Sequence, residues 1–370
     1  FTFARNQTDG YRSQSKMERT NFSWQSQIKF SDKQTLTGSV LFTDLFYQTP
    51  GALTAAELST NPKAARPAAG IFPGAENAKA AIDQKNITTG LTNQYHFNKI
   101  FKNTTTLYGV FNQIKNPAIR NYERRNEPGF GARTVFTYKK DFIEYTGQKE
   151  SSLQIVWGGE YQDGFFNTQV SKNKNGNPDT LQTNDDIRNT AFNLFVQGDI
   201  IIRESWFINT GISTNKTKVE FSRLNKYPVV KQSRVYQNEL APRISIKRKL
   251  MDELFLSATV SRGFSPPTIG ELLPSTGVIS TNLEAEYGWN YELTARYSIS
   301  KNKHRIDLDV TGFIFRLTNA LVQRRDAGGA DFFVNAGDTK QRGIETTVNY
   351  TFNSFNNRLI NYITVNTAYT

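Results

Sequence analysis

The sequence contains no cysteine and only two histidines among its 370 residues. Disulfide scaffolds, thiolate metal sites and cysteine nucleophiles are therefore excluded, and so are metal centres built from several histidines. It also lacks any apolar run that approaches the roughly 20 residues needed by a transmembrane helix. That absence excludes a helical membrane protein.

Aromatic residues, in contrast, are abundant: the chain has 27 Phe, 16 Tyr and 4 Trp. They are spread too regularly for a disordered chain, which is poor in aromatics. The formal net charge is +12, but the basic residues are scattered over many segments. No single basic stripe or recognisable module indicates nucleic-acid binding.

The two ends of the sequence suggest a segment of a longer protein. Phe1, Thr2 and Phe3 open the chain without a methionine, a charged region or an apolar region, so no signal peptide is recognised. The last residues, 366–370, fall in the middle of an apparent strand. We therefore expect further sequence on both sides.

The dominant pattern is an alternation of apolar and polar residues with a period of two, which is the period of a β-strand. In 293–299, for example, one face is apolar and the other carries Thr294, Arg296 and Ser298. Helical patterns are almost absent. About fifteen strands are predicted, near 1–11, 20–31, 34–47, 86–100, 103–115, 133–146, 151–170, 187–202, 205–221, 236–248, 253–263, 285–299, 303–316, 332–351 and 358–370.

Short and long connections alternate between these strands. Long loops are expected near 48–85, 116–132, 171–186, 222–235, 264–284 and 317–331. In an up-and-down antiparallel sheet, every second connection lies at the same end, so all tight turns gather at one end and all long loops at the other. This layout, with strands of about 9–11 residues or more, is typical of an outer-membrane β-barrel.

A β-propeller is less favoured because no repeat of about 40 to 50 residues is found. A soluble sandwich usually has shorter strands and no rule that alternate loops be long. The sequence thus predicts an all-β, transmembrane, antiparallel up-and-down barrel. Because such a barrel closes with an even number of strands, about fifteen would form only part of it.

Four motifs then resemble the C-terminal half of TonB-dependent outer-membrane receptors. They are Ser261-Arg-Gly-Phe-Ser-Pro-Pro-Thr268 with Glu271-Leu, Asn282-Leu-Glu-Ala-Glu286 with Tyr291-Glu-Leu293, Asn335-Ala-Gly337, and Arg342-Gly-Ile-Glu345. Their order and spacing make the set specific, although each would be weak alone. The motifs identify the family and are expected to shape the barrel rather than to bind the ligand.

A second, smaller set of motifs, nearer the start of the chain, resembles the ferric dicitrate branch of the siderophore receptors. It consists of Asp9-Gly-Tyr-Arg12 with Ser15, Thr49-Pro-Gly-Ala-Leu-Thr54, Asn61-Pro and Ala65-Arg-Pro67. The resemblance implies that residues 1–370 are part of one barrel domain and supply about 15 of the family's 22 strands. The plug domain, its TonB box and the C-terminal strands would lie outside this chain.

The resemblance also implies where and how such a protein works. It would be a multi-pass barrel in the outer membrane of a Gram-negative bacterium, in contact with lipid and lipopolysaccharide. Energy would come from the TonB-ExbB-ExbD complex acting through the plug. The protein would be no enzyme and would need no cofactor, since iron would enter only as part of the transported chelate.

Candidate ligand contacts are sought in the long loops, because the ligand of a plugged barrel binds at the extracellular mouth. The predicted loop 116–133 carries several arginines with aromatic residues between them. Guanidinium groups bind carboxylates through two parallel hydrogen bonds, which suits an anionic ferric chelate such as ferric citrate. The residues proposed from this loop and from a second group after 303–316 are Arg120, Arg124, Arg125, Arg133, Tyr122, Gln323, Arg324 and Arg325.

The same basic loop could instead be a solvated face, with Glu123 and Glu127 as partial counter-ions, turned towards anionic lipopolysaccharide. His96 and His304 lie on different predicted strands and have no metal-ligand spacing. No nucleophile or metalloprotease motif appears. A receptor for cobalamin, haem or an oligosaccharide, and an adhesive or structural barrel that transports nothing, remain alternatives to a siderophore receptor.

Overall fold

The computed structural model describes residues 1–143, 149–273, 279–325, 331–353 and 361–370. Nearly all of them lie in strands, which are β1 (Thr2–Thr8), β2 (Met17–Lys29), β3 (Gln34–Gln48), β4 (Ala81–His96), β5 (Phe101–Pro117), β6 (Tyr122–Ile143), β7 (Lys149–Lys174), β8 (Asn177–Ile202), β9 (Trp206–Arg223), β10 (Lys231–Met251), β11 (Leu254–Ser265), β12 (Glu286–Lys301), β13 (His304–Thr318), β14 (Leu321–Arg325), β15 (Asp331–Asn335), β16 (Thr339–Asn353) and β17 (Tyr362–Tyr369). The predicted all-β fold is confirmed.

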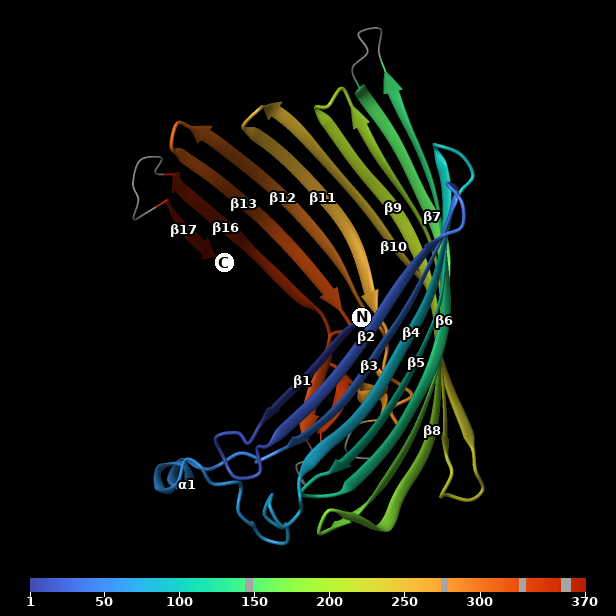
Figure 1. Cartoon of the computed structure of the whole chain (residues 1–370), viewed down its shortest axis with the longest axis vertical. Helices are drawn as coiled ribbons and strands as arrows, with labels where there is room; N and C mark the ends of the chain where they lie inside the picture. Colours follow the sequence, from blue (N-terminus) through green and yellow to red (C-terminus); the bar gives the residue numbers. More distant parts are fainter. Residues whose placement is uncertain (144–148, 274–278, 326–330, 354–360) are drawn as a thin grey trace.

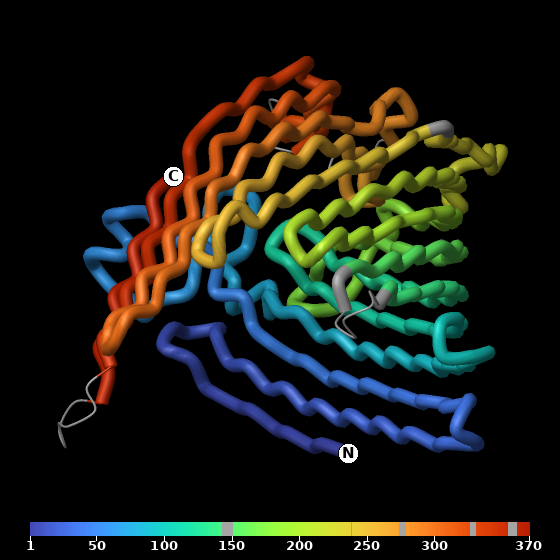
Figure 2. The backbone as a smooth tube through the Cα atoms, turned by 90° about the horizontal axis from the view of Figure 1, so that it is seen from above, coloured from blue at the N-terminus to red at the C-terminus, as the bar shows by residue number. Residues whose placement is uncertain are grey.

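Fifteen of these strands form one antiparallel sheet, in the order β1 to β13 followed by β16 and β17. Every neighbour in the sheet is a neighbour in sequence, except that the small hairpin β14–β15 interrupts the step from β13 to β16. The sheet curves into an open half-barrel with β1 and β17 at its two edges (Figures 1 and 2). This is the up-and-down topology expected from the alternation of connections.

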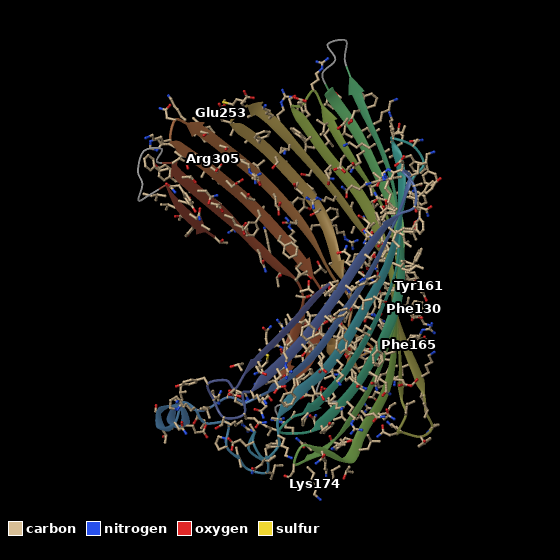
Figure 3. All side chains as sticks on the ribbon, in the orientation of Figure 1. Phe130, Tyr161, Phe165, Lys174, Glu253 and Arg305 are labelled. Atoms are coloured by element: carbon tan, nitrogen blue, oxygen red, sulfur yellow. The ribbon has the colours of Figure 1, made fainter. Side chains whose placement is uncertain are left out.

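The long loops all lie at one end of the sheet, together with two short turns between β5 and β6 and between β7 and β8, and the connections at the opposite end are short. Glu253 and Arg305 mark the short-turn end, and Lys174 marks the other end (Figure 3). The long-loop end includes two short helices, α1 (Ala55–Thr60) and α2 (Ile269–Leu272). Within the described residues, neither helix is long and apolar enough to cross a membrane.

The strand register assigns each side chain to one of two faces, because residues opposite each other on neighbouring strands share a face. Leu256, Ala295 and Val310 are opposite one another and belong to the outer face. On that face Leu293 is 64% exposed, and Phe130, Tyr161 and Phe165 project away from the enclosed side (Figure 3). An apolar face left exposed in this way fits contact with lipid.

The inner face is polar and its side chains are paired across strands. The hydroxyl oxygens of Thr294 and Thr311 lie 2.8 Å apart, and Arg296 donates to Asp309 at 2.7 Å. Such cross-strand pairs stabilise the sheet and hold the register. The inner face therefore has the polarity expected of a barrel interior.

Two of the six predicted long loops are wrong. The connection between β5 and β6 is only residues 118–121, and that between β7 and β8 is only Asn175 and Gly176, because β6, β7 and β8 continue through the ranges read as loops. β7 and β8 each have 26 residues. In the parts of these strands nearest the long-loop end, both faces carry polar residues. The alternation of apolar and polar residues that marks a half-buried strand is therefore lost there.

The other differences are smaller. The strand predicted at 332–351 is divided between β15 and β16, and the predicted loops 48–85 and 264–284 contain α1 and α2. Asn175 and Gly176 have φ angles of 53° and 82°. An Asn-Gly pair with both φ angles positive is the preferred two-residue turn of a β-hairpin, so this signal for a tight turn was present in the sequence.

Glycine 158 gives a direct test of the sheet. A Cβ atom at this position would lie 2.1 Å from the backbone oxygen of Thr134, whereas a Cβ at Gly312 would meet nothing within 4 Å. We expect Gly158→Ala to destabilise the folded sheet by about 1–3 kcal/mol, as overpacking does, and Gly312→Ala to have little effect. Denaturant unfolding of the intact protein in lipid measures both. Equal stability of the two variants would contradict the described register of β6 and β7.

Candidate ligand-binding mouth

The long-loop end of the sheet is called the mouth here, and its described residues are 9–16, 49–80, 118–121, 173–176, 224–230, 266–273, 279–285, 319–325 and 331–338. Residues 49–80 form its largest loop, which begins with a capped helix. Thr54 and Glu57 form a capping box at the start of α1. The hydrogen bond from the Thr54 backbone lowers the pKa of Glu57, so this cap keeps its charge at neutral pH.

Small residues allow the rest of this loop to pack against itself. Ala65, Ala75, Ala78 and Ala80 are buried together, with Ile119 beside them. The loop is also tied to its neighbours through backbone oxygens. Asn173 donates to the carbonyls of Ala78 at 2.8 Å and Ala118 at 2.7 Å. Loop 49–80, the β5–β6 turn and the β7–β8 tip are therefore held as one unit.

Two motif residues of the second resemblance, Arg12 and Ala65, take part in this packing. The Arg12 guanidinium donates to the Ala64 carbonyl at 2.9 and 3.0 Å, and the Ser13 backbone donates to the Lys63 carbonyl at 2.8 Å. These bonds join residues 9–16 to loop 49–80. In the structure these residues shape the mouth.

A second unit lies against the inner face of β8 and β9. Leu272 and Leu283, from the loop between β11 and β12, pack with Ile187, Val219 and Phe221 in one buried cluster. The Tyr236 hydroxyl donates to the Leu283 carbonyl at 2.9 Å. This loop therefore folds inward over the sheet and narrows the mouth.

Asn335 joins this inward loop to the β14–β15 hairpin. Its side-chain oxygen accepts from the Glu284 backbone at 2.9 Å, and its amide nitrogen donates to the Glu284 carbonyl at 3.1 Å and the Asn319 carbonyl at 2.8 Å. The Leu321 backbone donates to Glu286 at 2.6 Å. These hydrogen bonds join two of the motifs that resemble the family, around 282–286 and 335–337. We call this set of bonds the Asn335 clamp.

The structure separates the residues proposed from 116–133. Arg120 lies in the β5–β6 turn, exposed, with its guanidinium 4.9 Å from the centre of the Phe72 ring. Arg125 is on the inner face between Glu123 at 3.1 Å and Glu127 at 3.7 Å. Arg133 is also on the inner face but deeper in the sheet, where it contacts Glu160 at 3.1 Å.

Arg124 lies on the outer face, because successive residues of a strand alternate and Arg124 is opposite Lys115. Its guanidinium is 5.5 Å from the centre of the Tyr122 ring, and Tyr122 is only 7% exposed. Arg124 and Tyr122 are therefore poorly placed to contact a ligand on the inner side. Residues 116–133 were expected to form one loop that carries all these arginines. This expectation is wrong, because only residues 118–121 form a loop and the rest of the segment lies in β5 and β6.

The second proposed group lies on the β14–β15 hairpin. Arg325 donates to Asp331 at 2.8 Å, while Gln323 and Arg324 precede it on β14. The hydrogen bond from Arg325 lowers the pKa of Asp331, with further contributions from Gln323 and from the charge of Arg120. The contribution from Arg120 is the smallest of these, and both predicted basic groups lie at the mouth.

Sequence reasoning missed Phe72 and Asp331, but it named Glu123 and Glu127 as partial counter-ions of the basic loop, and both contact Arg125. The glutamates at 123 and 127 have the spacing that places them on the same strand face as Arg125, so their role becomes visible once β6 is known to be a strand. Phe72 and Asp331 depend on contacts between distant loops. In the described part of the chain, no group of three or more His, Cys, Asp or Glu is arranged to hold a metal ion.

Comparison with known families identifies the fold. The model of the family described as TonB dependent receptor-like, beta-barrel matches residues 23–370. The chain belongs to this family. Its members are outer-membrane β-barrels, in agreement with the apolar outer face and polar inner face of the sheet.

Solved structures share the fold at low sequence identity. The ferric citrate transporter FecA in its unliganded form is 14% identical with a TM-score of 0.69, over 95% of this chain and 50% of that chain. The alcaligin outer-membrane receptor FauA from Bordetella pertussis is 13% identical with a TM-score of 0.63, over 96% and 52%. The copper transporter OprC is 11% identical with a TM-score of 0.69, over 95% and 53%.

The chain thus spans about half the length of these solved structures. No curated protein matches its sequence. The resemblance stated from the motifs is confirmed at the level of the family.

The Asn335 clamp can be tested by a graded pair of variants. Asn335→Ala removes all three bonds, whereas Asn335→Asp keeps an acceptor for the Glu284 backbone and loses the two donated bonds. We expect hydrogen exchange at residues 279–285 to accelerate by about tenfold or more in Asn335→Ala and less in Asn335→Asp. Unchanged exchange in both variants would show that Asn335 does not hold the inward loop.

The Asp331–Arg325 pair gives a pH prediction. Because the pKa of Asp331 is below its ordinary value of 3.8, the pair is intact above that value and is lost only as the pH falls through the lowered pKa. The chain has no cysteine, so a dye on an introduced Ala336→Cys reports on the hairpin alone. Its emission should stay constant from about pH 8 to about pH 5. A midpoint within that range, absent in an Asp331→Asn version, would contradict the assignment.

Proposed function

We propose that this chain forms the wall and mouth of an outer-membrane receptor that imports a ferric siderophore. Ferric citrate or another anionic ferric chelate is the proposed ligand. Uptake would be driven by TonB-ExbB-ExbD through a plug domain, in the outer membrane of a Gram-negative bacterium. The chain itself would contribute binding and passage and no covalent chemistry.

The basic residues of the mouth, Arg120 in the β5–β6 turn and Arg325 on the β14–β15 hairpin, carry this proposal. Arg120 is exposed, and Arg325 donates to Asp331 at 2.8 Å. A guanidinium and its neighbours placed in this way suit a ligand that carries carboxylates. Phe72, stacked with Arg120, provides an apolar surface beside the charge.

Family membership supports the transport role, and the solved structures support it in part. These proteins are a ferric citrate transporter, an alcaligin receptor and a copper transporter. Each statement concerns that protein alone, at identities of 14%, 13% and 11%. The choice of an anionic chelate for this chain therefore rests on the chemistry of its own mouth.

Two arginines four residues apart provide a matched test. Arg120→Ala should weaken binding of ferric dicitrate to the intact receptor by about tenfold or more, because a hydrogen bond to a charged group contributes about 1.5–3 kcal/mol. Arg124→Ala should leave the affinity unchanged, since Arg124 lies on the outer face. Binding is measured by intrinsic tryptophan fluorescence, with neutral cobalamin as a comparison ligand.

The possible results test the choice of ligand and the assignment of the two faces separately. An unchanged affinity in Arg120→Ala would remove Arg120 from the site. An equal loss in Arg124→Ala would contradict the assignment of inner and outer faces. If only a neutral ligand binds, the receptor assignment stands and the anionic-chelate proposal is withdrawn.

A further inference from the structure

The tip of the β7–β8 hairpin contains the single Asn-Gly pair of the sequence, Asn175 and Gly176. Both residues have positive φ angles, 53° and 82°, and Asn175 is exposed to solvent. Lys174, directly before the turn, marks this tip at the long-loop end (Figure 3). The pair that favours a tight turn also places a side-chain amide next to an unhindered backbone nitrogen.

An asparagine that precedes glycine loses its side-chain amide without an enzyme. The backbone nitrogen of Gly176 attacks the Cγ atom of Asn175 and forms a five-membered imide, while the Cγ–Nδ2 bond breaks and ammonia leaves with the Gly176 amide proton. Water then opens the imide at either carbonyl, which gives aspartate or isoaspartate. Glycine favours the attack because it has no Cβ atom beside the nitrogen.

Asn173 engages the nitrogen that would attack. Its Oδ1 atom accepts from the Gly176 N–H at 2.8 Å, and its Nδ2 atom donates to the Ala78 and Ala118 carbonyls at 2.8 and 2.7 Å. The orientation of this side chain is therefore fixed by two other segments of the mouth. The Gly176 nitrogen is released only when the Asn173 side chain turns away.

The conformation of the turn also opposes the reaction. In the imide, the Cβ atom of residue 175 and the nitrogen of residue 176 lie on the same side of the Cα–C bond, whereas in the left-handed conformation, with ψ of about +47°, they lie on opposite sides. The tip must therefore open before the ring closes. Lys79 packs against the closed turn, since a Cβ atom at Gly176 would lie 2.8 Å from the Cδ atom of Lys79.

The strand pairing beneath the turn is weak, so the closed tip depends on Asn173. The register between β7 and β8 shifts on both sides of Ser171. Beyond the second shift, the two remaining pairs are Asn173 with Pro178 and Lys174 with Asn177. Proline has no N–H to donate to the ladder. The side-chain bonds of Asn173 thus replace part of the missing backbone pairing.

We propose that Asn175 is a site of spontaneous deamidation, that the bond from Gly176 to Asn173 slows the reaction, and that isoaspartate formation releases loop 49–80 from the tip. Isoaspartate inserts an additional carbon atom into the backbone of a two-residue turn, so the Gly176 N–H no longer meets Asn173. The bonds from Asn173 to loop 49–80 and to the β5–β6 turn are then lost. This chemistry belongs to the hairpin and is independent of the ligand that the mouth binds.

Two variants of Asn173 separate the bond to Gly176 from the bonds to the loops. Asn173→Ala removes the acceptor and should accelerate deamidation of Asn175 by about tenfold or more. Asn173→Asp keeps an acceptor for the Gly176 N–H but loses both donated bonds, and it should react several-fold more slowly than Asn173→Ala. The intact receptor is incubated in detergent at mildly alkaline pH, and the peptide that contains residue 175 is followed by mass spectrometry, with isoaspartyl methyltransferase labelling to detect isoaspartate.

Asn302 provides an internal reference in the same samples. It is also exposed and has a positive φ angle of 54°, but it precedes Lys303 and lies at the short-turn end. Its deamidation rate should be the same in every variant. An equal rate reports that the sheet outside the mouth is folded alike.

Hydrogen exchange on fresh and aged receptor tests the release of the loop. Exchange at residues 74–80 and 118–121 should be faster by about threefold or more once residue 175 is isoaspartate. Asn175→Gly is the matched control, because a Gly-Gly pair also forms this turn and has no amide to lose. Its exchange should not change with age.

The results support or overturn each part of the proposal. Equal deamidation rates in the unaltered receptor and in Asn173→Ala overturn the protective role of Asn173, and so do equal rates in the two Asn173 variants. Exchange that is unchanged in the aged receptor, or that changes equally in Asn175→Gly, overturns the release of loop 49–80. Deamidation that follows the loss of the Gly176 acceptor, with release confined to chains that carry isoaspartate, supports the proposal.

Discussion

Backbone pairing between neighbouring strands is the constraint on which the rest of this structure depends. Within hydrocarbon, a strand has no water to satisfy its N–H and C=O groups, so each must bond to an adjacent strand. The chain meets this requirement with a single antiparallel sheet of fifteen strands, nearly all neighbours in sequence. Each edge strand has one partner among the described residues, and a barrel in lipid needs both edges paired.

Pairing fixes the register, and the register fixes the face of every side chain. A shift of one residue would exchange the lipid-facing and inward-facing sets. The same rule separates neighbours with similar chemistry, as at Arg124 and Arg125, which lie on opposite faces of β6. It also places the ion pairs of Glu220 with Lys218 and Lys231 on the outer wall, away from Arg120 and Arg325 at the mouth.

The alternating pattern predicted the sheet well wherever one face is apolar, as in β12 and β13. It failed in the outer parts of β6, β7 and β8, where both faces are polar and the period of two disappears. Asn175 and Gly176 carried the information for a tight turn, but they were included in a long predicted loop. Reading them as a hairpin turn would have shown β7 and β8 to be continuous.

The candidate site was predictable only in part. Residue types indicated arginines suited to an anion, and in the structure Arg325 bonds to Asp331 while Arg120 lies exposed in the β5–β6 turn. The orientation of Arg124 required strand parity, and the partners of Arg120 required contacts between loops far apart in sequence. The same holds for Leu272 and Leu283, whose burial against Val219 and Phe221 no local pattern indicates.

The most direct test of the account is the alternation of faces along β12 in a membrane. Because the chain has no cysteine, single cysteines at each position from 291 to 297 can be spin-labelled in the intact receptor and reconstituted in lipid. Contact with oxygen, which concentrates in lipid, should be high at Leu293 and Ala295, and contact with a water-soluble nickel chelate should be high at Thr294 and Arg296. An accessibility profile without a period of two, or with the two sets exchanged, would contradict the assignment of the inner and outer faces.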